Sequence, residues 1–151
     1  MTAKLLVSAC LLGSPVRYDG RDKKLASGFL ERLAAEGRLV AICPELAGGL
    51  PVPRSPAEIQ SDGRVTDPTG ADVSAEFREG ARQALALAQG EGCRFALLTD
   101  GSPSCGSSFV HDGSFSVARV AGRGVTAALL EAHGIRVFAP DRIEELAALL
   151  G

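Results

Sequence analysis

Four short apolar segments, separated by stretches with helical spacing, are the feature that most limits the folds open to this sequence. The segments are Lys4–Ser8, Leu39–Ile42, Phe95–Leu98 and Ile135–Phe138. Runs of this length, bounded by glycine and proline, favour buried strands over helices. Strands that alternate with helices predict a parallel sheet covered by helices on both faces. We therefore expect an α/β fold, a single Rossmann-like three-layer domain with a four-stranded, mainly parallel sheet.

The segments between the strands carry start and stop signals for helices. Asp72 and Asp141 stand where two helices are expected to begin, and glycines follow the expected helix ends. Asp112-Gly113 predicts the turn of a small hairpin, Phe109–Ser116, after the third strand. The Gly- and Pro-rich stretch between Cys43 and Asp72 shows neither a helical nor a strand period, which is typical of functional or disordered loops.

Charge and hydropathy exclude several kinds of partner. The net charge is −2 over 151 residues without a block of Lys or Arg, which argues against a polymeric nucleic-acid partner. No apolar run approaches the ~20 residues of a membrane span, and the N-terminus lacks a signal-peptide layout. We expect one domain, residues 1–151, in a cytoplasmic protein with no membrane partner. The sequence leaves the oligomeric state open.

Three of the four cysteines, Cys10, Cys43 and Cys105, each come just after a predicted strand. Ligands of parallel sheets bind outside the carboxyl ends of the strands, and neighbouring strands lie ~4.8 Å apart. The three thiols are therefore expected to meet at one edge of the sheet. Cys93 precedes its strand and is interpreted as a small buried residue.

Three thiolates at one site suit a soft metal, either zinc or an iron–sulfur cluster. Zinc would need a fourth ligand or a bound water. A [4Fe–4S] cluster with three cysteine ligands would leave one iron open, which is able to act as a Lewis acid. We interpret His111 as a solvated turn residue and His133 as a helix-end residue rather than as ligands.

Polar residues near these cysteines are candidates for reactive groups. Glu45 follows Cys43 by two residues and is a candidate general base, or else a solvated loop residue. Ser102 precedes Cys105 by three residues and either binds a reacting group or supports its own turn. Arg17 and Arg54 either balance the charge of the thiolates or lie on the surface.

Several stretches together resemble a known family along nearly the whole chain. They are Ser8–Gly20, Cys43–Gln60, Ser102–Ser108, Asp112–Ser116 and Gly124–Phe138. In this order they resemble the family first labelled domain of unknown function 523 and now associated with thiouracil desulfidases.

The resemblance implies a [4Fe–4S] enzyme that removes sulfur from a thiolated pyrimidine without a redox step. Cys10, Cys43 and Cys105 would hold the cluster and leave one iron open for the sulfur of the substrate. Glu45 would activate a water, and Ser102 would position or protonate the reacting group. The products would be the oxo-pyrimidine and sulfide.

The expected substrate is a free thiouracil-type base. Some members of the family carry an additional domain and act on thiolated RNA nucleosides, and this sequence shows no such addition. The absence of Trp and the single Tyr also argue against Trp or Tyr platforms for stacked bases.

Two other functions compete with this one. The first is a non-catalytic cytoplasmic iron–sulfur or metal-binding module, which would have no use for Glu45 as a base. The second is a cluster-free hydrolase with Cys105 as the nucleophile, which lacks a convincing histidine base.

Overall fold

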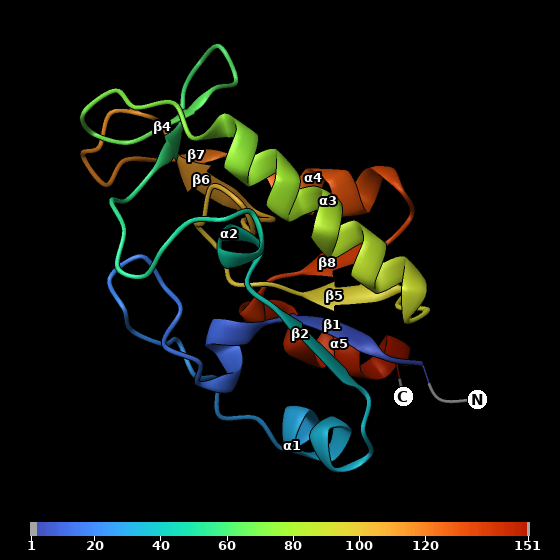
Figure 1. Cartoon of the computed structure of the whole chain (residues 1–151). Coiled ribbons are helices and arrows are strands. Elements are labelled where there is room, and N and C mark those ends of the chain that lie inside the picture. Colours follow the sequence, from blue (N-terminus) through green and yellow to red (C-terminus); the bar gives the residue numbers. More distant parts are fainter. Residues whose placement is uncertain (1–2, 151) are drawn as a thin grey trace.

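A four-stranded parallel sheet is the centre of the computed structural model, which describes residues 3–150 (Figure 1). Its strands are β1 (Leu5–Ser8), β2 (Leu39–Ile42), β5 (Phe95–Leu97) and β8 (Arg136–Phe138). Their order is β2-β1-β5-β8, and all three pairings are parallel. The predicted α/β class is confirmed.

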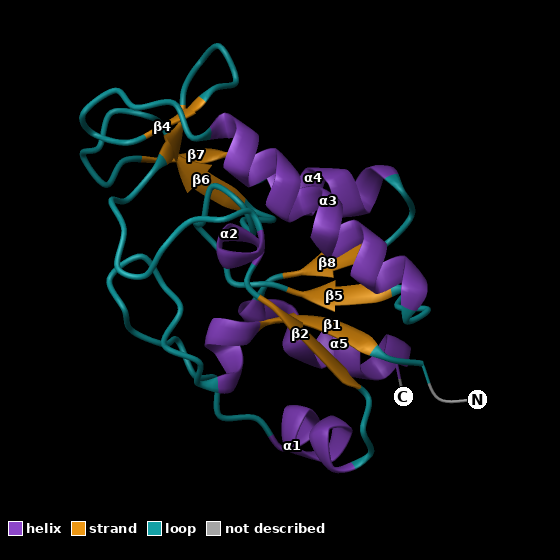
Figure 2. Ribbon diagram, viewed as in Figure 1, coloured by secondary structure: helices purple, strands orange, loops and turns teal. Residues whose placement is uncertain are grey.

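Helices cover both faces of this sheet and form the two outer layers of the fold (Figure 2). One face carries α3 (Ser74–Gly90) and α4 (Val125–Ala132), and the other carries α1 (Gly28–Ala35) and α5 (Ile143–Leu150). Within residues 3–150, no helix is both long and apolar enough to cross a membrane.

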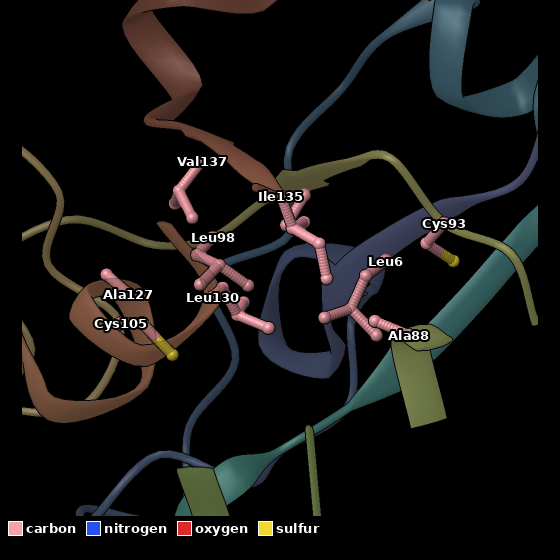
Figure 3. Close-up of a cluster of buried hydrophobic side chains, with 10 residues drawn as sticks. Leu6, Ala88, Cys93, Leu98, Cys105, Ala127, Leu130, Ile135 and Val137 are labelled. Atoms are coloured by element: carbon pink, nitrogen blue, oxygen red, sulfur yellow. The ribbon is translucent and has the colours of Figure 1, made fainter. Parts of the chain in front are cut away.

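The side chains of β1 point alternately to two separate clusters of the hydrophobic core. Leu6 packs toward α3 and α4, and Leu5 and Val7 pack toward α1 and α5, because successive side chains of a strand point to opposite faces. All three are fully buried. Figure 3 shows the cluster around Leu6, which also contains Ala88 and Leu130 from the two helices above it. Full burial of such a leucine stabilises the fold by about 1.5–3 kcal/mol.

The smaller elements lie beyond the carboxyl ends of the strands (Figure 1). They include the short helices η1 (Ala9–Leu12) and α2 (Pro44–Ala47). Two antiparallel hairpins complete this end of the molecule, β3 (Glu58–Ile59) with β4 (Val65–Thr66), and β6 (Phe109–His111) with β7 (Arg119–Ala121). The stretch after Cys43, where no period was found, thus contains one helix and one hairpin too short to show a period.

The hairpin after the third strand exists, but its predicted extent was wrong. Its second strand is β7 rather than a segment before Ser116, and a longer turn joins it to β6. The carboxylate of Glu58 accepts hydrogen bonds from the backbone N–H groups of Gly113 (2.9 Å) and Phe115 (3.2 Å). These bonds hold the turn against β3 and keep its residues out of the ladder.

The two predicted helix starts differ in outcome. Asp72 lies just before α3, where its side chain accepts a hydrogen bond from the backbone N–H of Ser74 at 2.9 Å. Asp141 instead lies inside the short 3₁₀ helix η2 (Pro140–Arg142) and does not cap α5, which begins at Ile143.

Two leucines on α5 test the assignment of the core. Leu146 is fully buried and Leu149 is 48% exposed. We expect Leu146→Ala to lower the free energy of unfolding by about 2–5 kcal/mol, because it leaves a cavity. Leu149→Ala should change it by less than about 1 kcal/mol. Urea titrations measure both values, and equal losses would contradict the packing of α5.

Candidate functional site

The three cysteines that follow strands lie on one cavity at the carboxyl end of the sheet. Cys10 lies in η1 after β1, Cys43 precedes α2 after β2, and Cys105 lies in the loop after β5. Because β1 pairs with both β2 and β5, the three connections leave adjacent strands at the same edge. All three thiols are free and line a cavity of about 830 Å³. Strand order reverses at β1, which is where such sheets bind ligands.

Hydrogen bonds from side chains shape the loop that carries Cys105. The Asp100 carboxylate accepts bonds from the backbone N–H groups of Gly101 (2.9 Å), Ser107 (3.2 Å) and Phe109 (3.4 Å), and from the hydroxyl of Ser108. Burial alone would raise the pKa of Asp100, but the Ser108 hydroxyl and these N–H groups hold it below its usual value. The carboxylate thus organises the backbone of this loop.

The same loop is fixed against the start of α4. The backbone N–H groups of Val125 and Thr126 each donate a 2.8 Å bond to carbonyls of the loop, and the Ser104 and Thr126 hydroxyls are bonded at 2.7 Å. A Cβ on Gly124 would lie 2.4 Å from the Ser104 carbonyl, so only glycine permits this approach. The contact fixes the loop that carries Cys105 to the N-terminus of α4.

Burial raises the pKa of two of the three thiols, those of Cys105 and Cys10. It raises the pKa of Cys105 to about 12, although a hydrogen bond from Ser8 (3.7 Å) opposes the shift and the charges of Glu45 and Cys10 add to it. It also raises the pKa of Cys10, an effect that Cys43 increases. A thiol of this kind is a poor nucleophile at neutral pH. The hydrolase alternative therefore lacks an activated cysteine.

The arrangement of the possible ligands bears on which kind of metal centre this edge could hold. Zinc bound at about 2.3 Å needs its ligand sulfurs about 3.8 Å apart. Among the described residues, no group of three or more Cys, His, Asp or Glu side chains is gathered closely enough to hold one metal ion. An iron–sulfur cluster needs ligands that are spread more widely, because each cysteine binds a different iron. Three free thiols around one cavity fit a cluster better than a single ion.

Cys93 takes no part in this arrangement. It is buried at the start of β5, and Figure 3 shows it at the opposite end of the hydrophobic cluster from Cys105. Burial raises its pKa to about 11. Its interpretation as a core residue agrees with this position.

Glu45 lies in α2 on the wall of the same cavity and forms a mostly buried ion pair with Arg54. Its Oε2 accepts from Arg54 Nε at 2.7 Å and also contacts Nη2, and its Oε1 accepts from the Ser102 hydroxyl at 3.3 Å. The Ser102 Oγ in turn accepts from the backbone N–H groups of Ser104 (3.0 Å) and Cys105 (3.1 Å). Ser102 therefore supports its own turn, which is one of the two functions considered for it, and its hydroxyl also faces Glu45.

Arg54 also connects the loops around the cavity. Its guanidinium donates to the carbonyls of Pro51 (3.0 Å) and Val16 (3.1 Å), and its backbone N–H donates to the Tyr18 carbonyl at 2.8 Å. Its side chain is only 7% exposed. The sequence left its position open, because no spacing rule links an arginine in a Pro-rich loop to a carboxylate nine residues earlier.

The remaining walls of the cavity are rich in aromatic side chains. Tyr18, Phe77, Phe109 and Phe115 are four of the seven aromatic residues in the chain, and all line this cavity. The sequence argued only against Trp or Tyr platforms, and here phenylalanines from α3 and the second hairpin line the cavity. His111 also lines the cavity, so its interpretation as a solvated turn residue was wrong; it ends strand β6.

Known proteins share this sequence and fold. A family model described as 2-thiouracil desulfurase matches residues 5–142. The uncharacterized protein YbbK of Bacillus subtilis (strain 168) is 38% identical over 151 residues, covering 94% of this chain and 99% of the relative. The solved structure of the [4Fe-4S]-dependent thiouracil desulfidase TudS is 54% identical, with a TM-score of 0.96 over 99% of this chain and 98% of that one.

Substitution of Arg54 tests how much its ion pair with Glu45 stabilises the fold. Arg54→Met leaves the Glu45 carboxylate without its cation and should lower the free energy of unfolding by about 3 kcal/mol. Arg82 pairs with Glu79 on α3, where the side chains are 67% and 39% exposed, so Arg82→Met should cost less than about 1 kcal/mol. Urea denaturation of the two variants compares them, and a loss no larger at Arg54 than at Arg82 would contradict the structural role of Arg54.

Proposed function

Since this chain belongs to the 2-thiouracil desulfurase family, we propose that it is an iron–sulfur-dependent enzyme that desulfurates a thiolated pyrimidine. The observation that carries the proposal is that three free thiols and an ion-paired glutamate share one cavity. The identity of 54% to a [4Fe-4S]-dependent thiouracil desulfidase over nearly the whole chain supports the same activity.

Cys10, Cys43 and Cys105 are the residues that would hold the cluster. When bound there, a [4Fe–4S] cluster with three cysteine ligands supplies one open iron, a Lewis acid for the sulfur of the substrate. Hydrogen bonds on the protein side already orient two of these thiols. The Cys105 sulfur accepts from Ser8, and the Cys43 thiol donates to the Val16 carbonyl at 3.8 Å.

Glu45 is the residue proposed to activate water. Arg54 binds its Oε2, whereas Oε1 accepts from the Ser102 hydroxyl and has a lone pair left for a water. Glu45 would take a proton from that water as its oxygen attacks the thiocarbonyl carbon. The C–O bond forms, the C–S bond breaks, and the water protons end on the released sulfide. No electrons enter or leave, so the reaction needs no redox partner.

Ser102 is proposed to direct a proton toward the reacting group. Because its oxygen accepts two backbone N–H bonds, its own hydrogen must point away from the loop. In the free protein that hydrogen points to Glu45. A substrate bound between them would receive the same hydrogen bond.

The cavity suits a planar heterocycle. Its volume of about 830 Å³ lies within the usual range for small-molecule sites, and aromatic rings form part of its wall. Apolar, aromatic and polar side chains all line it. A thiolated pyrimidine fits this combination of flat apolar faces and polar edge groups.

Cysteine substitutions test where the cluster binds. After anaerobic reconstitution, Cys10→Ala, Cys43→Ala and Cys105→Ala should each reduce bound iron to less than about half of the unsubstituted value and abolish sulfide release from 2-thiouracil. Cys93→Ala is the matched control and should retain both. Full iron content in any of the first three variants would remove that cysteine from the ligand set.

Substitution of Glu45 separates catalysis from cluster binding. Glu45→Gln keeps the size of the side chain but loses the base, so kcat for desulfuration should fall by about 10²–10⁴-fold while iron content is unchanged. Glu79→Gln, at an exposed ion pair on α3, is the control and should have no effect. Unchanged kcat in Glu45→Gln would refute water activation by this residue, and no sulfide release from the unsubstituted protein would favour a binding module without catalysis.

A further inference from the structure

His111 carries a buried polar atom that nothing in the described part of the protein satisfies. Its Nδ1 is inaccessible to solvent and has no hydrogen-bond partner within residues 3–150. Buried polar atoms in folded proteins nearly always have a partner, so an orphan next to a cavity indicates a missing ligand. His111 lines the cavity that also contains Cys10, Cys43 and Cys105.

The neighbours of His111 hold its ring in place without bonding to it. Phe109 lies two residues earlier on β6, on the same face, with its ring edge-on to the imidazole (6.3 Å between centroids, 84° between planes). Arg119 is the register partner of His111 on β7, and its guanidinium lies 4.3 Å from the centre of the Phe109 ring. The imidazole thus belongs to a packed wall and is not a loose surface group.

The carboxylates near His111 in the chain and on β3 already accept hydrogen bonds from other residues. Asp112 accepts bonds from the backbone N–H (2.9 Å) and the hydroxyl (2.5 Å) of Ser114. Glu58 accepts from the N–H groups of Gly113 and Phe115. Each of these acceptors therefore has donors in the turn, and neither satisfies Nδ1 of His111. Because Nδ1 is covered in the free protein, a molecule in the cavity reaches it only when the side chains that pack on the imidazole shift.

We propose that His111 determines specificity by donating a hydrogen bond from Nδ1 to the ring carbonyl of the substrate that is remote from the reacting sulfur. This rests on the proposed function, in which the thiols and Glu45 engage the sulfur and the carbon that bears it. The second carbonyl of a thiouracil-type base is then the polar group that remains to bind His111 on β6. A carbonyl requires a donor, which the imidazole N–H supplies.

The test uses two substrates that differ in this carbonyl. The reconstituted holoenzyme is assayed with 2-thiouracil and with pyrimidine-2-thione, which lacks the second carbonyl. We expect His111→Phe to lower kcat/KM for 2-thiouracil by about 10–100-fold and to leave that for pyrimidine-2-thione within about twofold. His111→Asn, which retains a donor near the position of Nδ1, should recover part of the loss. His133→Phe, at an exposed histidine whose Nδ1 lies 3.0 Å from the Leu129 carbonyl, is the control.

Two further readouts separate this proposal from the proposed function. Iron content and the visible spectrum should be the same in all variants, which shows that each variant folds and carries its cluster. Calorimetric titration with uracil, which needs no turnover, should show binding about 10–100-fold weaker in His111→Phe. Equal uracil binding, or equal losses for both thiolated substrates, would overturn the role of His111. An unsubstituted enzyme that binds uracil but releases no sulfide would overturn the proposed function alone.

Discussion

The parallel pairing of β1 with two neighbours is the constraint on which the site depends. β2 and β5 flank β1, so the connections after all three strands emerge side by side and carry Cys10, Cys43 and Cys105 to one cavity. Leu5, Leu6 and Val7 fix this arrangement because both faces of β1 are fully buried. A shift of β1 by one residue would exchange its two faces and move Cys10 away from the cavity.

Polar contacts fix the loops that build the cavity, in addition to the apolar packing of residues such as Leu11 and Cys105. Asp100 accepts hydrogen bonds from backbone N–H groups of the loop after β5, and Glu58 accepts them from the turn after β6. Arg54 donates to three backbone carbonyls and also pairs with Glu45. Buried ionic groups of this kind add little net stability, because desolvation offsets much of their attraction. Their contribution is geometric, since they fix the direction of a carboxylate and a hydroxyl at the edge of the cavity.

Much of this arrangement was predictable from short-range patterns. The apolar runs predicted the four strands, and the position of each cysteine after its run placed three thiols at one edge. The sequence could not reveal contacts between segments that are distant in the chain. Glu58 binds a turn more than fifty residues away, which moved the second strand of the hairpin, and β3 and β4 are two residues each, too short to show a period. His111 was misjudged for the same reason, because its burial depends on the wall formed by its neighbours.

The proposed function requires a cluster at the carboxyl edge of this sheet, with one iron free for substrate. Anaerobically grown crystals of the reconstituted protein, measured at the iron absorption edge, would locate it. They should show an anomalous signal in the cavity from irons bonded to the sulfurs of Cys10, Cys43 and Cys105, and one iron that has no protein ligand. Iron bound at Cys93, or a fourth protein ligand that closes the cluster, would contradict it.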